Sequence, residues 1–238
     1  MSSLKTKAIV LGNINLKEKD KLVDLFTLEY GRMAVSMKGV RGEKAKLKMA
    51  KEPFCFGEFV IENTKGNNIV TQVDIVDNFY DLTKDIDKFY EGCALLDIIK
   101  NVATAQCESE IFIETLKALK TLCYENVKKY YVFNKFLIKL TEILGYSFIN
   151  EKCSSCGATM KIVYFDLTKG MFVCPNCKTE ASFKVGLDAF KGIDNLSQTQ
   201  YEKLSTLNLP ANAEKEILKI LALNLEWRAG LKVLKINN

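Results

Sequence analysis

The sequence predicts an α+β protein, in which a small β-barrel at the amino terminus is followed by a mostly α-helical domain. Three observations support this fold class. Short strand-like runs crowd the first third of the chain, apolar residues then recur at helical spacing, and two Cys-x-x-Cys pairs interrupt the helical part. We therefore place a barrel domain at residues 1–78 and a helical domain at residues 79–238, with a four-cysteine ribbon inserted at about 149–183.

Five short runs rich in apolar side chains predict the strands of the barrel, at residues 8–11, 22–27, 32–37, 54–62 and 69–76. In the third run, Met33, Val35 and Met37 alternate with small or polar residues, as they do in a half-buried strand. Residues 22–30 also have helical spacing, so a short helix is the alternative there. Five strands with one long polar connection fit an OB-fold, a barrel whose face and loops commonly hold single-stranded nucleic acid.

Beyond residue 77 the apolar residues recur every three or four positions, which predicts helices at residues 85–102, 111–124 and 127–144. Gly145 is placed to end the third of these helices. After the ribbon, Ser197 begins a predicted capping box for a helix that carries Tyr201 and Leu204. Asn212 then begins a longer helix, which places four residues on its buried side: Ile217, Leu218, Leu221 and Leu225.

Two Cys-x-x-Cys pairs form the most specific pattern of the chain: Cys153, Cys156, Cys174 and Cys177. Two such pairs around a short insert have the spacing of a structural zinc site, in which four thiolates complete a tetrahedron. The insert alternates over residues 161–166 and turns at 168–170, which predicts a β-hairpin with a cysteine pair at each end, a zinc ribbon. Because four thiolates leave no position for water, we expect one structural zinc ion per chain. A rubredoxin-like iron centre, a disulfide pair or four unrelated buried cysteines are the alternatives.

Composition indicates where the protein works. The chain has 238 residues, no apolar run of membrane-spanning length and no apolar core of a signal peptide, so we expect a cytoplasmic protein without a membrane partner. In that reducing compartment, the remaining cysteines are expected to be small buried hydrophobic residues rather than disulfide partners. They are Cys55, Cys93, Cys107 and Cys123.

Composition also argues against catalysis. The chain has no histidine, which removes the usual general base, and no phosphate-binding or dinucleotide-binding glycine motif. We therefore expect neither an enzyme nor a small-molecule substrate. A nuclease that uses a transient metal ion is the alternative, with Glu18, Asp20 and Glu58 as candidate carboxylates.

Positive charge is concentrated in the stretch from residue 38 to residue 51, where six basic residues face one acid, Glu43. Because the whole chain has a net charge of +5, the remainder is close to neutral. A solvated loop is the alternative, but so many cations in one glycine-containing stretch favour binding to the phosphates of nucleic acid. The predicted DNA-binding residues are Lys38, Arg41, Lys44, Lys46, Lys48 and Lys51.

Short motifs along the whole chain, taken in order, resemble the bacterial RecO family of DNA repair proteins. They include Lys7-Ala-Ile-Val-Leu11, Glu18-Lys-Asp20, Lys38-Gly-Val-Arg41, Gly57-Glu58, Leu144-Gly-Tyr146, Tyr164-Phe-Asp166 and the four cysteines. One departure lies in the predicted hairpin turn, where Lys169 stands at a position that is often a second glycine in the family.

The resemblance implies a recombination mediator that is not an enzyme. Such a protein binds single-stranded and double-stranded DNA, anneals complementary strands, and works with RecR to load RecA onto strands coated by single-stranded DNA-binding protein. It would be cytoplasmic and associated with the nucleoid. A protein–protein adaptor, in which the ribbon and helices bind partners and the barrel is only scaffold, is the alternative.

The resemblance also implies that the helical domain captures the acidic, apolar-tipped carboxy-terminal tail of single-stranded DNA-binding protein. Such a peptide requires a hydrophobic pocket rimmed by cations. The candidate residues are Lys128, Lys129, Tyr130, Lys135 and Lys139, beside Tyr131.

Overall fold

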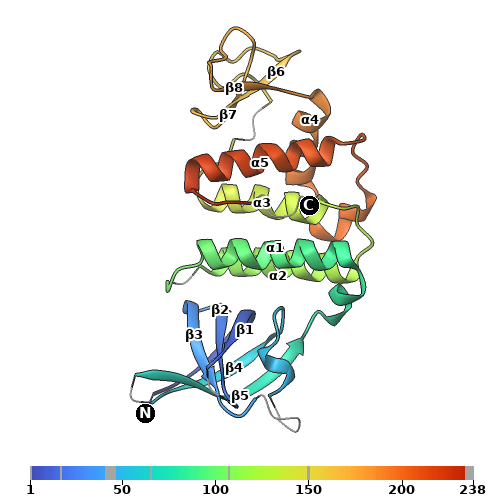
Figure 1. Cartoon of the computed structure of the whole chain (residues 1–238). Helices are drawn as coiled ribbons and strands as arrows, with labels where there is room; N and C mark the ends of the chain where they lie inside the picture. Colours follow the sequence, from blue (N-terminus) through green and yellow to red (C-terminus); the bar gives the residue numbers. More distant parts are fainter. Residues whose placement is uncertain are drawn as a thin grey trace. The chain divides into compact units, whose positions relative to one another are not determined.

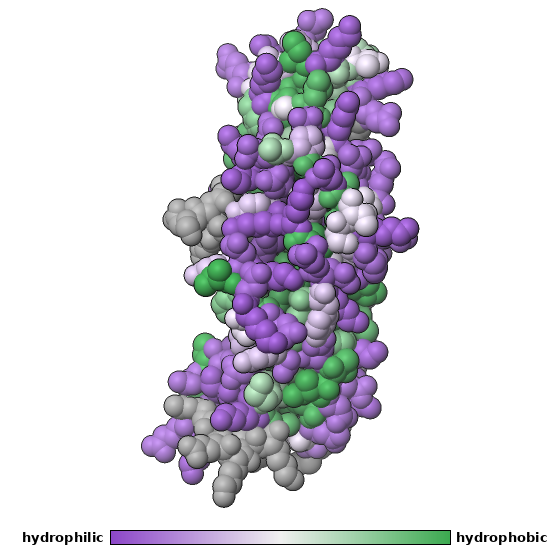
Figure 2. Space-filling model, turned by 90° about the vertical axis from the view of Figure 1, so that its right-hand side faces the viewer, coloured by the Kyte–Doolittle hydropathy of each residue, from purple (hydrophilic) through white to green (hydrophobic). Residues whose placement is uncertain are grey.

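The computed structural model describes residues 2–16, 18–40, 47–64, 66–106, 108–148 and 151–233. They form two compact units, Met1–Cys123 and Tyr124–Asn238 (Figure 1). Among the described residues, no helix is both long and apolar enough to cross a lipid bilayer. Hydrophilic side chains cover most of the face drawn in Figure 2, with smaller hydrophobic groups between them.

The first unit contains a closed barrel of five strands in the order β1-β2-β3-β5-β4. The strands are β1 (Ser2–Asn15), β2 (Lys21–Thr27), β3 (Gly31–Met37), β4 (Phe56–Thr64) and β5 (Asn67–Asp77). Neighbours pair antiparallel except β3 and β5, which close the barrel through a parallel contact between Ser36 and Ile69. The predicted OB-like barrel is confirmed, whereas the alternative helix at 22–30 is wrong because β2 pairs along its length with β1 and β3.

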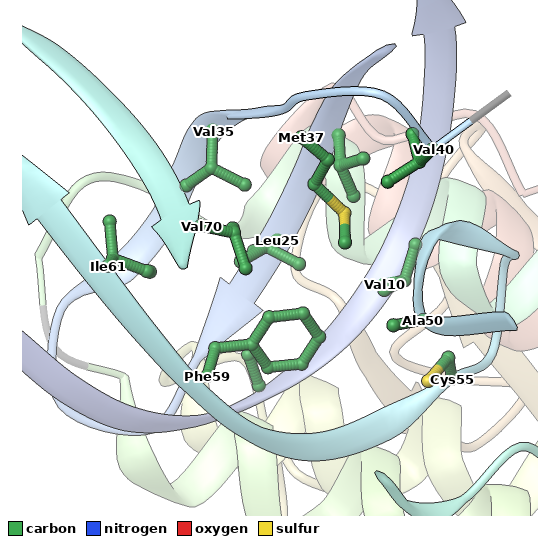
Figure 3. Packing of buried hydrophobic residues seen from close by; sticks show 12 residues of the cluster. Val10, Leu25, Val35, Met37, Val40, Ala50, Cys55, Phe59, Ile61 and Val70 are labelled. Carbon is green, nitrogen blue, oxygen red and sulfur yellow. The ribbon is translucent and has the colours of Figure 1, made fainter. Parts of the chain in front are cut away.

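Alternating side chains of the strands fill the barrel (Figure 3). Leu25, Val35 and Phe59 are fully buried at its centre. Val40 and Ala50, which lie outside the strands, belong to the same cluster. The long connection between β3 and β4 is therefore anchored to the core on both sides of its central part.

Two helices, α1 (Ile86–Val102) and α2 (Ser109–Tyr124), follow the short 3₁₀ helix η2 (Tyr80–Lys84). The ring of Phe112 in α2 lies 5.5 Å from that of Phe26 and 6.3 Å from that of Phe56, both in the barrel. The backbone N–H of Arg32 also donates to the carbonyl of Thr104 after α1. These contacts place α1 and α2 in the same compact unit as the strands, so the first unit extends to Cys123. The domain boundary predicted from the sequence, between residues 78 and 79, instead marks the change from strands to helices, which follows the end of β5 at Asp77.

Gly31 begins β3 with a φ of +65°, and a Cβ atom there would collide with the carbonyl oxygens of Thr104 and Gln106. We expect Gly31→Ala to lower the free energy of unfolding by at least about 2 kcal/mol, because both backbone strain and a clash with rigid backbone follow. Gly39→Ala is the matched control, since Gly39 has a φ of +68° but no atom within 4 Å of the new Cβ. Urea denaturation checks the prediction, and equal losses in the two variants would contradict it.

The second unit combines three helices with a small sheet. The elements are α3 (Tyr131–Ile143), β6 (Val163–Asp166), β7 (Met171–Val173), β8 (Ser182–Val185), α4 (Leu187–Gln198), the 3₁₀ helix η3 (Tyr201–Thr206) and α5 (Ala213–Ala229). The sheet has the order β7-β6-β8 and lies in the chain between α3 and α4, so the predicted insertion of a ribbon into a helical domain is confirmed. The strand β8 is an addition that the sequence reading missed.

Several predicted helix ends in this unit need correction. The third predicted helix begins at Tyr131 rather than at residue 127, because Tyr130 adopts a left-handed φ of +68°. The capping box at Ser197 is wrong, since Ser197 lies within α4 and its hydroxyl donates to the carbonyl of Asp194. Gly145 ends α3 at a φ of +78°, and α5 begins after Asn212, both as predicted, although the Asn212 side chain makes no capping hydrogen bond.

Candidate metal centre and nucleic-acid interface

The four cysteines of the ribbon converge. The sulfur atoms of Cys153, Cys156, Cys174 and Cys177 all lie within 4.8 Å of one another. The first pair precedes β6 and the second directly follows β7, so the hairpin brings both pairs to the same end of the sheet. Gly157, at a φ of +73°, supplies the tight turn after the first pair. Among the described residues, these four cysteines are the one cluster of side chains that could hold a metal ion.

The spacing and chemistry of the sulfur atoms fit a metal ion. The Sγ atoms of Cys156 and Cys174 lie 3.8 Å apart. A tetrahedron with metal–sulfur bonds of about 2.3 Å has edges of about 3.8 Å, so this pair already has the separation of two zinc ligands. The cysteines are free rather than disulfide-bonded, which removes the disulfide alternative.

The electrostatics of the cysteine cluster are compatible with a bound cation. Burial opposes ionisation of Cys153, but backbone N–H groups, led by that of Cys174, lower the pKa of this thiol to about 6. The crowded side chains of Cys156 and Cys174 in turn raise the pKa of Cys177 to about 12. Ionisation is therefore favoured at Cys153 and opposed at Cys177, and a divalent cation bound among the four sulfur atoms would allow four thiolates to coexist.

Asp166, at the end of β6, organises the loops around the metal centre. Its buried carboxylate accepts hydrogen bonds of 2.5–2.9 Å from the Thr168, Thr179 and Ser182 hydroxyls and the Lys169 backbone N–H. Burial alone would raise the pKa of Asp166, but these hydrogen bonds hold it well below the usual value. The sequence placed Asp166 in a strand and in a family motif but did not indicate this role, because the four donors become neighbours only in the folded ribbon.

Lys169 fits the turn despite its departure from the family pattern. Gly170 follows it at a φ of +62° and supplies the left-handed residue that the turn requires. The Lys169 ammonium donates to the Ser155 hydroxyl at 3.1 Å and to the Cys177 carbonyl at 3.3 Å. This lysine therefore ties the hairpin turn to both cysteine pairs.

The predicted basic connection leaves β3 at Lys38 and returns to the barrel through the 3₁₀ helix η1 (Met49–Lys51). Lys38 and Lys48 are exposed. The Gly39 backbone N–H donates to Asp20 at 2.9 Å, which ties the start of the connection to the loop between β1 and β2. Three of the predicted DNA-binding residues lie outside the described part of the chain: Arg41, Lys44 and Lys46.

Lys51 differs from the other cations of this stretch. It is only 7% exposed, and its ammonium forms an ion pair with Glu52. Its backbone carbonyl accepts a hydrogen bond from the Asn13 side chain at 2.8 Å. Lys51 therefore joins η1 to β1 and is covered, unlike the exposed Lys38 and Lys48.

The lysines predicted to bind a peptide tail differ in their exposure. Lys135 is 3% exposed, and its ammonium donates to the Ser197 carbonyl at 2.6 Å. Lys139 forms an ion pair of 2.6 Å with Glu142. Lys128 donates to the Asn208 side chain, and the Lys129 ammonium lies 5.2 Å from the centre of the buried Tyr130 ring. Lys128 and Lys129 are thus the exposed members of this set.

Two of the three candidate nuclease carboxylates have partners in the structure. Glu58 forms an ion pair with Lys5, and Asp20 accepts from Gly39, while Glu18 is exposed. Cys55 and Cys123 are buried and Cys93 is half-buried. Cys107 lies outside the described residues.

Comparison with known proteins decides the family. A family model described as "Recombination protein O N terminal" matches residues 1–79, and a second, "Recombination protein O C terminal", matches residues 83–235. The chain belongs to the RecO family. Members of this family act in DNA repair and recombination, which agrees with the resemblance seen in the motifs.

RecO relatives match nearly the whole chain. A DNA repair protein RecO from Clostridium novyi (strain NT) is 30% identical over 223 residues, covering 93% of this chain and 87% of the relative. Another from Caldanaerobacter subterraneus subsp. tengcongensis is 30% identical over 225 residues, covering 93% and 91%. One from Clostridium acetobutylicum is 25% identical over 225 residues, covering 93% and 90%.

Proposed function

We propose that this RecO family member is a DNA-binding recombination mediator and not an enzyme. It binds single-stranded and double-stranded DNA, anneals complementary strands, and with RecR helps to load RecA onto strands coated by single-stranded DNA-binding protein. The observation that carries the proposal is the closed barrel whose long β3–β4 connection has five basic residues and one acid, Glu43, between residues 38 and 48, besides the covered Lys51 and its partner Glu52. Such a barrel with a basic connection suits a phosphate backbone, and family membership supports a role in recombination.

The binding should be largely independent of base sequence. Lysine predominates in the stretch, and an ammonium acts as a point charge without the planar fork that reads guanine edges. Fluorescence anisotropy with a labelled 20-nucleotide strand and the matching duplex measures both affinities. If the protein binds neither DNA at moderate salt, the barrel is only scaffold and the adaptor function replaces this proposal. DNA incubated with the protein and magnesium is expected to remain uncut.

Replacing Lys44, Lys46 and Lys48 by alanine is expected to weaken binding to all sequences alike. Each phosphate contact contributes about 0.7 to the slope of log affinity against log salt for a single strand, so three lost contacts flatten that slope by about two units. A salt titration by fluorescence anisotropy provides the measurement. Alanine at Lys203, Lys215 and Lys219, three exposed lysines of the second unit, makes the same charge change as a control. An unchanged slope in the first triple variant would mean that these lysines do not meet phosphate.

We propose zinc as the ion at the four cysteines, one per chain and structural. Thiolate donors and tetrahedral spacing suit zinc, and a fully thiolate-ligated ion has no open position for catalysis. A rubredoxin-like iron centre has the same donor set. Elemental analysis of protein purified without chelator distinguishes the two metals.

The proposed partners are RecR and the tail of single-stranded DNA-binding protein. An acidic tail requires exposed cations, and Lys128 and Lys129 are the members of the predicted set that remain exposed. A labelled tail peptide titrated with the full chain tests the site. Binding that is unchanged after Lys128→Ala and Lys129→Ala would place the tail elsewhere.

A further inference from the structure

A cavity of about 600 Å³ lies in the first unit, where β1, β2 and β3 meet the end of α1. The strand register explains the hollow. Gly12 pairs with Asp24, and Asp24 pairs with Ala34, so two small residues flank one carboxylate across three strands. Because Val23 and Leu25 point into the barrel core, Asp24 and its neighbours in this row face outward. The cavity is therefore on the outer face of the barrel.

Arg32 is held rigidly in this cavity. Its guanidinium donates to both carboxylate oxygens of Asp24 at 2.9–3.2 Å and to the carbonyl of Lys100. The side chain nevertheless keeps 38% of its surface exposed. A guanidinium fixed at its edges still offers its flat face, and arginine planes stack on nucleobases.

Lys100 brings a positive charge to the same cavity. Its ammonium lies 3.6 Å from the point that a Cβ atom on Gly12 would occupy. No carboxylate pairs with this ammonium among the residues that the structure describes. The Lys21 ammonium is also close, since it donates to the side chain of Asn13 in the cavity wall. Asp24, the acidic residue of the lining, is already neutralised by Arg32.

Apolar side chains form the rest of the wall. Ile14 pairs with Leu22 across β1 and β2, and both line the cavity. Ile14 is 63% exposed, so its side chain is open to a ligand in the cavity. The cavity thus combines a flat stacking surface, an apolar wall and an unpaired cation. A flat ring joined to an anion, which is the chemistry of a nucleotide, complements all three.

We propose that this cavity holds one unpaired nucleotide of a DNA strand, with its base against Arg32 and Ile14 and its phosphate at Lys100. The inference rests on the proposed function and adds a contact that a single strand makes and a duplex does not. Bases in a duplex are paired and stacked on both faces, so only an unstacked base enters such a cavity. Duplex DNA is bound by the basic connection alone, whereas a single strand uses both surfaces.

The test compares two affinities in variants of the full chain, by anisotropy with labelled dT20 and a 20-base-pair duplex at one salt concentration. Arg32→Lys keeps the charge but removes the flat face, and we expect it to weaken dT20 binding about tenfold while duplex binding stays within about twofold. Lys100→Gln should weaken dT20 binding about threefold to tenfold and Lys100→Arg should restore it. Lys120→Gln, an exposed lysine of α2, is the charge-matched control. Ile14→Ser, at an exposed position, repeats the test if Arg32→Lys proves unstable.

The outcomes separate the inference from the function on which it rests. Loss confined to dT20 supports the cavity. Equal losses for single strand and duplex, or no difference between Lys100→Gln and Lys120→Gln, overturn it while leaving DNA binding in place. Thymidine monophosphate should compete only at concentrations far above those of dT20. If it competes as well as dT20 does, the cavity is a site for free nucleotides and the inference is overturned. Failure of the unaltered protein to bind either DNA would instead overturn the proposed function.

Discussion

Replacing Cys174 by serine is expected to abolish stoichiometric metal binding and to unfold the cysteine end of the ribbon. Four sulfur atoms lie within 4.8 Å of one another, and the proposed metal would hold them together against their mutual repulsion, so a lost ligand would remove much of the local folding free energy. Apparent zinc-binding free energies of small thiolate sites are about 10–16 kcal/mol, which makes this the largest effect expected of any single substitution in the chain. Elemental analysis should find about one metal ion per chain before the substitution and almost none after it.

Amide hydrogen exchange determines how far the damage spreads. Amides around the two cysteine pairs should exchange quickly in Cys174→Ser, while amides in the barrel core keep their protection because the barrel belongs to the other compact unit. Cys93→Ser is the matched control, since Cys93 is a half-buried thiol in α1, far in sequence from the ribbon. Unaltered protein that contains neither zinc nor iron would contradict the prediction, and so would loss of metal in the Cys93 variant.

An aromatic cluster limits the unfolding to one end of the ribbon. The Phe165 and Phe172 rings of paired strands lie 5.2 Å apart, and Phe172 packs at 4.9 Å on Phe190 of α4. Phe148 contacts both ribbon rings. Edge-to-face aromatic pairs contribute about 0.5–1.5 kcal/mol each beyond their buried area. We therefore expect β6 and β7 to remain near α4 when the metal is lost, with disorder concentrated at the cysteine pairs.

The features predicted correctly from the sequence depend on local signals. Strand alternation placed Val35 and Met37 in the barrel core, and the spacing of the four cysteines placed them in one cluster. Both signals are short-range, because a side-chain period or a two-residue spacing needs no knowledge of the rest of the chain. The turn at Gly145 was predictable for the same reason.

Features that depend on register or packing were not predictable. Gly12, Asp24, Ala34 and Lys100 are distant in sequence and meet only because the strand register and α1 bring them together. Lys135 was predicted to be a binding cation, yet it is buried in a helix, where its ammonium donates a hydrogen bond to the carbonyl of Ser197, 62 residues away. A pattern of residue types gives no sign of such a distant partner.

Replacing Asp166 by alanine is expected to destabilise the ribbon by about 2–3 kcal/mol, because four hydrogen-bond donors on exposed or half-buried residues lose their buried, charged acceptor at once. These donors lie in two separate loops, 168–169 and 179–182, and the second loop directly follows Cys177. The variant should therefore release its metal to a chromophoric chelator faster than the unaltered protein does. Asp188→Ala removes an exposed carboxylate from the first turn of α4 and should change the release rate little.

A second, sharper measurement is the stability of the ribbon without metal as a function of pH. The pKa of Asp166 in the folded protein lies below its value of about 4 in the unfolded chain. Its contribution to the free energy of unfolding of the ribbon is therefore complete above about pH 4 and is lost as the pH falls through the folded pKa. The difference in ribbon stability between unaltered protein and Asp166→Ala, followed by amide exchange in chelator, should be constant from about pH 7 to about pH 5 and should shrink below about pH 4. Asp166→Asn, which cannot ionise, should show no such narrowing relative to Asp166→Ala. A difference that persists undiminished into strong acid would mean that shape rather than charge holds the two loops.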